Sequence, residues 1–123
     1  MSAAANGPGQ CDVKTMISVT IEDFEEEVLN CPLPVFVCFT TQPCAPCFPL
    51  CLLARDLAEE HSGRVKFVTI DTKEEADLAD RYDVLSVPTA ILFRDSKPAS
   101  RLLGFHSKSV LRSLLAEAMK DDA

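Results

Sequence analysis

The sequence lacks a long hydrophobic run, a basic block and an internal repeat. No unbroken apolar segment is longer than that of residues 35–39, which is far shorter than the ~20 residues that a membrane-spanning helix needs. Lysine and arginine total 12 against 19 aspartate and glutamate residues, which gives a formal net charge of −7. No cluster of basic residues is present that could neutralise a phosphate backbone. These absences argue against a membrane partner and against nucleic acid.

The N-terminus also lacks the basic region and apolar stretch of a secretory signal, so we expect a cytoplasmic protein. Hydrophobic residues make up 47% of the chain and charged residues 25%. This ordinary globular composition excludes a disordered or collagen-like chain. Residues 1–12 are mostly small and polar, which predicts a flexible N-terminal tail, and residues 13–123 fit a single domain.

Helical and strand patterns alternate along the chain. Helices are predicted at residues 21–30, 46–61 and 73–80 and after Ser107, and strands at residues 35–39, 65–70, 89–93 and 100–103. The strand at 35–39 is an unbroken apolar run, which is typical of a central strand covered on both faces. The order predicts an α/β fold with a central mixed β-sheet flanked by helices on both faces. Chemistry then belongs at the carboxyl ends of the strands.

Three of the six cysteines are closely spaced, as Cys44-x2-Cys47-x3-Cys51. Without a secretory signal, this spacing favours redox catalysis or metal binding over a structural disulfide framework. Cys44 lies where the central strand turns into the second helix, with Pro46 at the expected first helical position. The positive end of the helix dipole favours a thiolate there, so Cys44 is the candidate nucleophile. Cys47 lies close enough to attack a mixed disulfide at Cys44 and is the candidate resolving thiol.

The chain resembles the thioredoxin family from about residue 17 to residue 119. The resemblance rests on the strand at 35–39, on the motif Cys44-Ala45-Pro46-Cys47 and on these further segments: Ile70-Asp71, Tyr82-Asp83-Val84, Ser86-Val87-Pro88-Thr89, Phe93 and Gly104. It implies a thioredoxin fold and a thiol–disulfide oxidoreductase that reduces protein disulfides. The redox-active group would be the Cys44–Cys47 disulfide, with no further cofactor. The resemblance also implies a monomer that a thioredoxin reductase, or a dedicated reductase, recharges.

The resemblance assigns further roles beside the two motif cysteines. Pro88 corresponds to the family's cis-proline, and Val87 would offer its backbone to an extended substrate segment by main-chain pairing. Ala45 and Pro46, between the cysteines, should tune the reduction potential through the stability of the Cys44 thiolate.

Four positions depart from the family pattern. Pro43 replaces an aromatic residue, Ala45 replaces a glycine, and Leu52 stands where the family has a kink-forming proline. Cys38 replaces the buried aspartate that is thought to accept the proton of the resolving thiol. A thiol is a weaker acceptor, so either water or another group deprotonates Cys47, or turnover is slower.

The cysteine spacing leaves alternatives open. A metal or iron–sulfur module could use Cys44, Cys47, Cys51 and Cys38, because the first three share roughly one helix face. A non-catalytic adaptor could bind partners through the Pro88 loop alone. The plainer expectation for Cys38 and Cys51 is core packing. Cys11 and Cys31 are expected to be free thiols.

Overall fold

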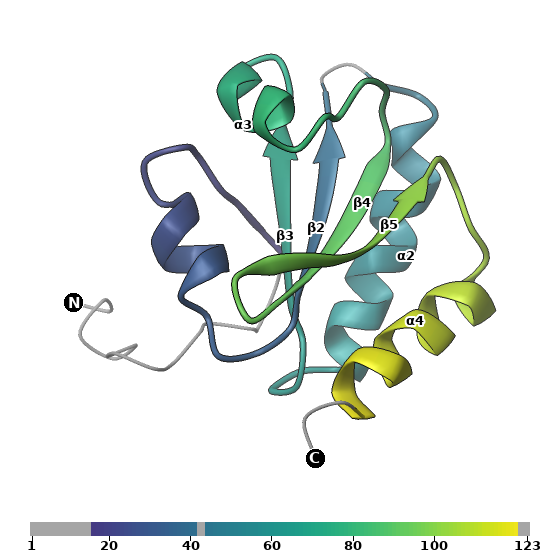
Figure 1. The fold of residues 1–123 in the computed structure, drawn as a ribbon. Coiled ribbons are helices and arrows are strands. Elements are labelled where there is room, and N and C mark those ends of the chain that lie inside the picture. The colour runs from purple at the N-terminus through teal and green to yellow at the C-terminus, as the bar shows by residue number, and fades with distance from the viewer. Residues whose placement is uncertain (1–15, 42–43, 121–123) are drawn as a thin grey trace.

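The computed structural model describes residues 16–41 and 44–120. It contains a five-stranded sheet in the order β1-β3-β2-β4-β5, shown in Figure 1. The strands are β1 (Ile17–Ser18), β2 (Val35–Thr40), β3 (Lys66–Asp71), β4 (Thr89–Arg94) and β5 (Lys97–Leu103). β3 pairs in parallel with β1 and β2, whereas β4 pairs antiparallel with β2 and β5. The predicted mixed sheet with residues 35–39 at its centre is confirmed.

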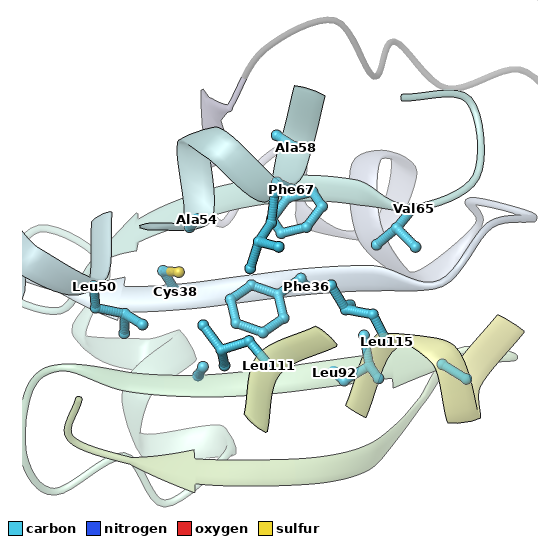
Figure 2. Close-up of a cluster of buried hydrophobic side chains, with 13 residues drawn as sticks. Phe36, Cys38, Leu50, Ala54, Ala58, Val65, Phe67, Leu92, Leu111 and Leu115 are labelled. Atoms are coloured by element: carbon cyan, nitrogen blue, oxygen red, sulfur yellow. The ribbon is translucent and has the colours of Figure 1, made fainter. Parts of the chain in front are cut away.

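Helices cover both faces of this sheet. They are η1 (Glu25–Leu29), α2 (Cys47–Glu60), α3 (Ala76–Arg81) and α4 (Lys108–Lys120). Side chains alternate between the two faces of a strand, so β2 contributes to two separate clusters. Phe36 and Cys38 pack with residues of α2 and α4, as Figure 2 shows, while Val37 and Phe39 pack with residues of η1 and α3. Each face of the central strand is therefore buried, which explains its unbroken apolar sequence.

The first helix is shorter and wider than the sequence predicts. Residues 21–23 form a turn, and Glu25–Leu29 form a single π-helical stretch closed by the bond from Asn30 N–H to Glu25 C=O at 2.8 Å. The Asp23 carboxylate accepts from the Thr20 N–H at 2.7 Å, which is one half of a capping box before this stretch. Glu27 pairs with Lys66 of β3, which is almost completely buried, and this contact ties η1 to the sheet.

Two other element boundaries differ from the predicted ones because local polar groups form turns. The backbone amides of Lys73 and Glu74 donate to the Asp71 carboxylate, at 2.8 and 3.1 Å, and α3 begins only at Ala76. Asp95 and Ser96 both have positive φ, at 54° and 69°, and form a two-residue turn, so β5 already begins at Lys97. No helix in the described residues is long and apolar enough to cross a membrane.

Candidate functional site

The site lies at the edge of the sheet where β2 ends and β4 begins. Phe39 of β2 pairs with Thr89 of β4 in antiparallel register. The chain after β2 leads into α2, and the chain before β4 carries Pro88, so this register brings both segments to one edge. The sequence predicted this edge from the order of helices and strands.

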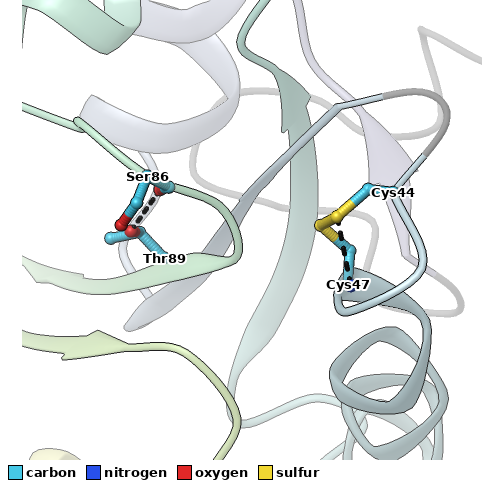
Figure 3. The surroundings of a disulfide bond; sticks show 4 residues. All are labelled: Cys44, Cys47, Ser86 and Thr89. Carbon is cyan, nitrogen blue, oxygen red and sulfur yellow. Dashed lines mark hydrogen bonds between the residues drawn. A yellow bond between two sulfur atoms is a disulfide. The ribbon is translucent and has the colours of Figure 1, made fainter.

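Cys44 and Cys47 form a disulfide at this edge, with their Cα atoms 5.3 Å apart. Cys44 is half-buried, whereas Cys47 is only 3% exposed. The Cys47 N–H donates to the Cys44 Sγ at 3.1 Å (Figure 3). This amide belongs to the first turn of α2, and it also donates to the Cys44 C=O at 3.2 Å, so both of its acceptors are atoms of Cys44. The start of the helix therefore directs a donor at the Cys44 sulfur, an arrangement that in the reduced chain would favour a thiolate there.

α2 begins one residue later than predicted. Pro46 stands just before the first helical residue, Cys47, with a φ of −68° that already suits the helix. Pro49 also lies within the first turn, where a missing N–H costs no regular helical hydrogen bond. Ala45 and Pro46 are both exposed, so the surface between the two cysteines is open to a partner.

The loop before β4 faces the disulfide from the β4 side of the sheet, as Figure 3 shows. The peptide bond between Val87 and Pro88 is cis. The Thr89 hydroxyl donates to the Ser86 C=O at 2.7 Å, and the Gly104 N–H donates to the Pro88 C=O at 2.8 Å. Within residues 16–41 and 44–120, no backbone hydrogen bond uses the N–H or C=O of Val87. The loop is thus held at both ends and leaves the Val87 backbone unpaired.

Cys38 and Cys51 remain as thiols near the disulfide. Cys38 is fully buried in the cluster of Figure 2, which confirms core packing, and this burial, helped by Cys51, raises its pKa. Cys51 is only half-buried, so core packing does not describe it. Its partial burial raises its pKa, although the guanidinium of Arg55 acts in the opposite direction. Both thiols therefore stay protonated at neutral pH.

A cavity of about 380 Å³ adjoins the disulfide on the side of β1 and β3. Its wall includes Cys44, Cys47 and Cys51 together with Arg55 and Thr69. Neither Arg55 nor Thr69 was predicted from the sequence to be part of the site. Arg55 could have been found by spacing, because it follows Cys47 and Cys51 at intervals of four residues on one helix face.

The structure also bears on the metal-binding alternative and on the expected free thiol at Cys31. Among the described residues, no three His, Cys, Asp or Glu side chains lie close enough to hold a metal ion, so the structure gives the metal-binding alternative no support. Cys31 is disulfide-bonded, and the expectation of a free thiol there is wrong. Cys11, Pro43 and the predicted tail at 1–12 lie outside the described residues.

Comparison with known proteins decides the family. The Thioredoxin family model matches residues 15–117, which is most of the chain. The chain belongs to the thioredoxin family. Thioredoxin C-2 of Corynebacterium nephridii is 30% identical over 101 residues, covering 82% of this chain and 94% of the relative. The thioredoxin of Allochromatium vinosum is 34% identical with the same coverage, and that of Rickettsia bellii is 32% identical, covering 76% of this chain and 90% of the relative.

The thioredoxin family and the disulfide at the start of α2 together identify a thiol–disulfide oxidoreductase. The fold is the α/β thioredoxin fold that the sequence predicted. The predicted cis peptide bond before Pro88 is confirmed.

Proposed function

We propose that this chain reduces protein disulfides, with Cys44 as the nucleophile and Cys47 as the resolving thiol. The observation that carries the assignment is the bond from the Cys47 N–H to the Cys44 Sγ at 3.1 Å. It shows the first turn of α2 directed at one sulfur of the pair. Cys44 is also the more exposed of the two, so it is the sulfur that a large substrate can reach.

The reaction transfers two electrons from the dithiol to the substrate. The Cys44 thiolate attacks one sulfur of the substrate disulfide, that S–S bond breaks, and the other substrate sulfur leaves as a thiolate and takes up a proton. Cys47 then loses its proton and attacks the Cys44 Sγ, which releases the second substrate thiol. The Cys44–Cys47 disulfide forms in this step and must be reduced before the next cycle.

The Pro88 loop supplies the surface for an extended substrate segment. Val87 offers an N–H and a C=O that the described part of the chain leaves unpaired, so a substrate strand can pair with them. Exposed apolar side chains flank this loop, namely Leu85, Leu103 and Phe105. Main-chain pairing next to a non-specific apolar surface suits many different protein substrates.

Electrons return to the chain from a separate reductase of the flavin- and NADPH-dependent type or from a dedicated partner. The redox group is the cysteine pair itself, so the chain works without a bound cofactor. A reducing compartment such as the cytoplasm suits this cycle, because thiols persist there. One chain carries both thiols and the Pro88 loop, which is consistent with action as a monomer.

Reduction of insulin by dithiothreitol tests the proposal. The wild-type chain should accelerate the precipitation of insulin, and Cys44→Ser should abolish this acceleration. Cys38→Ala is the matched control, because it also removes a thiol but one with no contact to solvent, and it should keep the activity. No acceleration over dithiothreitol alone by the fully reduced wild-type chain would refute the proposal.

A further inference from the structure

The cavity beside the disulfide is separate from the surface assigned to protein substrates. Its lining residues come from β1, β2, β3, α2 and the segments that adjoin them, and none comes from the loop that carries Pro88. β2 stands between β3 and β4 in the sheet, so the cavity and Pro88 lie on opposite sides of the strand that leads to Cys44. A ligand in the cavity would leave the Pro88 loop free.

The lining of the cavity is mixed, with polar side chains beside the apolar Met16, Phe48 and Leu52, and it carries one positive charge. Arg55 is the single charged residue among the lining residues that the structure describes, although the chain as a whole is acidic. No carboxylate in the described residues lies within ion-pair distance of Arg55. The neighbouring acid at the end of β3, Asp71, accepts from backbone amides of the following turn instead. The cavity is therefore suited to an anion.

Hydroxyl groups line the opposite wall. The parallel register of β1 and β3 pairs Ser18 with Thr69, and their hydroxyl oxygens are 3.4 Å apart. Thr40 and Thr41 continue this polar wall toward the disulfide. The Thr41 Oγ1 is buried and has no hydrogen-bond partner among residues 16–41 and 44–120. A buried hydroxyl without a partner is costly, and a polar ligand would satisfy it.

We propose that this cavity binds a small thiol that carries carboxylates, of the glutathione class, and brings its sulfur to the Cys44–Cys47 disulfide. The volume of about 380 Å³ lies at the lower end of the range for small-molecule sites and is too small for a folded partner. Arg55 would bind a carboxylate, the hydroxyl wall would bind the peptide-like groups, and the sulfur would lie against the disulfide. This inference rests on the proposed function only in that Cys44 and Cys47 exchange disulfides.

The chemical step reduces the protein and oxidises the ligand. A bound thiolate attacks the Cys44 Sγ, the Cys44–Cys47 bond breaks, and Cys47 leaves as a thiolate and takes up a proton. A second thiolate attacks the ligand sulfur of the mixed disulfide, forms the ligand disulfide and releases the Cys44 thiolate. Two ligand thiols are oxidised to one disulfide, and the protein gains two electrons. The small thiol would thus be a second source of electrons for the chain.

Single-turnover reduction of the oxidised chain tests the inference. The chain has no tryptophan, so samples are quenched with acid, alkylated and resolved by mass, which separates disulfide, mixed disulfide and dithiol. The initial rate should saturate with rising glutathione concentration, because a binding step precedes exchange. It should stay linear with dithiothreitol, which is neutral, and with cysteamine, which has no carboxylate. A linear dependence on glutathione would overturn the inference.

Substitutions of residues that line the cavity provide a second test of the inference. Arg55→Gln should raise the half-saturating glutathione concentration about tenfold, as expected for the loss of a charge-assisted hydrogen bond, and leave the dithiothreitol rate unchanged. Arg55→Lys should retain most of the binding, and Thr69→Val should weaken it. The matched control is Arg64→Gln, which removes the same charge just before β3, at the end of that strand away from the disulfide.

The outcomes separate this inference from the proposed function. If Arg55→Gln slows dithiothreitol as much as glutathione, or if Arg64→Gln behaves like Arg55→Gln, the cavity has no role in binding. Insulin reduction with dithiothreitol does not depend on Arg55, so it should persist in every cavity variant. If the wild-type chain fails to reduce insulin, the proposed function is contradicted. The dependence of the single-turnover rate on glutathione concentration still decides this inference.

Discussion

Replacing Cys38 by alanine separates packing from catalysis at the position where the family has a buried acid. Cys38 is fully buried between α2 and the sheet, among Leu50, Ala54 and other apolar side chains. The substitution deletes one sulfur atom and leaves a small cavity, which should lower the free energy of unfolding by roughly 1–2 kcal/mol. In a domain of this size, the melting temperature should fall by about 5 °C for each kcal/mol.

The same substitution should leave catalysis unchanged. Burial, helped by the neighbouring Cys51, raises the pKa of Cys38, so this thiol holds its proton throughout the neutral range. A protonated thiol cannot accept the proton of Cys47, which must go to water or to the substrate. We therefore expect the pH profile of insulin reduction to be the same for Cys38→Ala and the wild-type chain.

Urea unfolding measures the loss of stability in Cys38→Ala. Initial rates of insulin reduction across a range of pH measure its catalysis. Both are made at a temperature at which the variant is fully folded. A folded Cys38→Ala protein whose pH profile moves by about one unit or more, or whose rate collapses, would show that Cys38 takes part in proton transfer. The reasoning from its burial would then be wrong.

Two further predictions concern stability. Glu27→Gln should destabilise the fold by about 3 kcal/mol, because Lys66 is 1% exposed and would lose its counter-ion, whereas Lys66→Met should cost less in the same urea experiment. Equal losses of unfolding free energy in the two variants would show that the ion pair itself is the source of stability. At the surface, a hydrogen bond from Arg112 holds the pKa of Glu60 at about 2, below its value of about 4.3 in an unfolded chain. Its contribution is therefore present above the unfolded pKa and lost as the pH falls through about 2, so Glu60→Gln should lower the urea midpoint near neutral pH and have no effect at the acid end. A difference that persists at the acid end would contradict this assignment.

Local patterns were enough to predict the elements that position the disulfide. The strand at 35–39 and the helix at 46–61 have patterns that depend on residues close in sequence, and both were predicted to within one residue at each end. The π-helical stretch at 25–29 was not, because the sequence shows an ordinary amphipathic pattern there. Glu27 within this stretch contacts Lys66, which lies 39 residues away and is not part of the local pattern.

The dithiol could be predicted from the spacing of its cysteines, whereas the cavity beside it could not be predicted from the sequence. Cys44 and Cys47 lie in one motif, and the strand-to-helix turn around them has a local signature. The cavity instead depends on strand register, which brings Ser18 beside Thr69 from 51 residues away. Nothing near either residue indicates this pairing. The disulfide at Cys31 was missed for a similar reason, since the sequence around it shows only a helix end before a proline.

The most direct test of the central claim is to identify which cysteine reacts first. The reduced chain is treated briefly with limiting iodoacetamide near pH ~6.5, below the ordinary pKa of a thiol, and the alkylated peptides are mapped. Cys44 should be labelled ahead of every other cysteine, and Cys47→Ser should keep this labelling and accumulate mixed disulfides between Cys44 and substrate proteins. Labelling of Cys47 or Cys51 first, or mixed disulfides at either of those positions, would contradict the account.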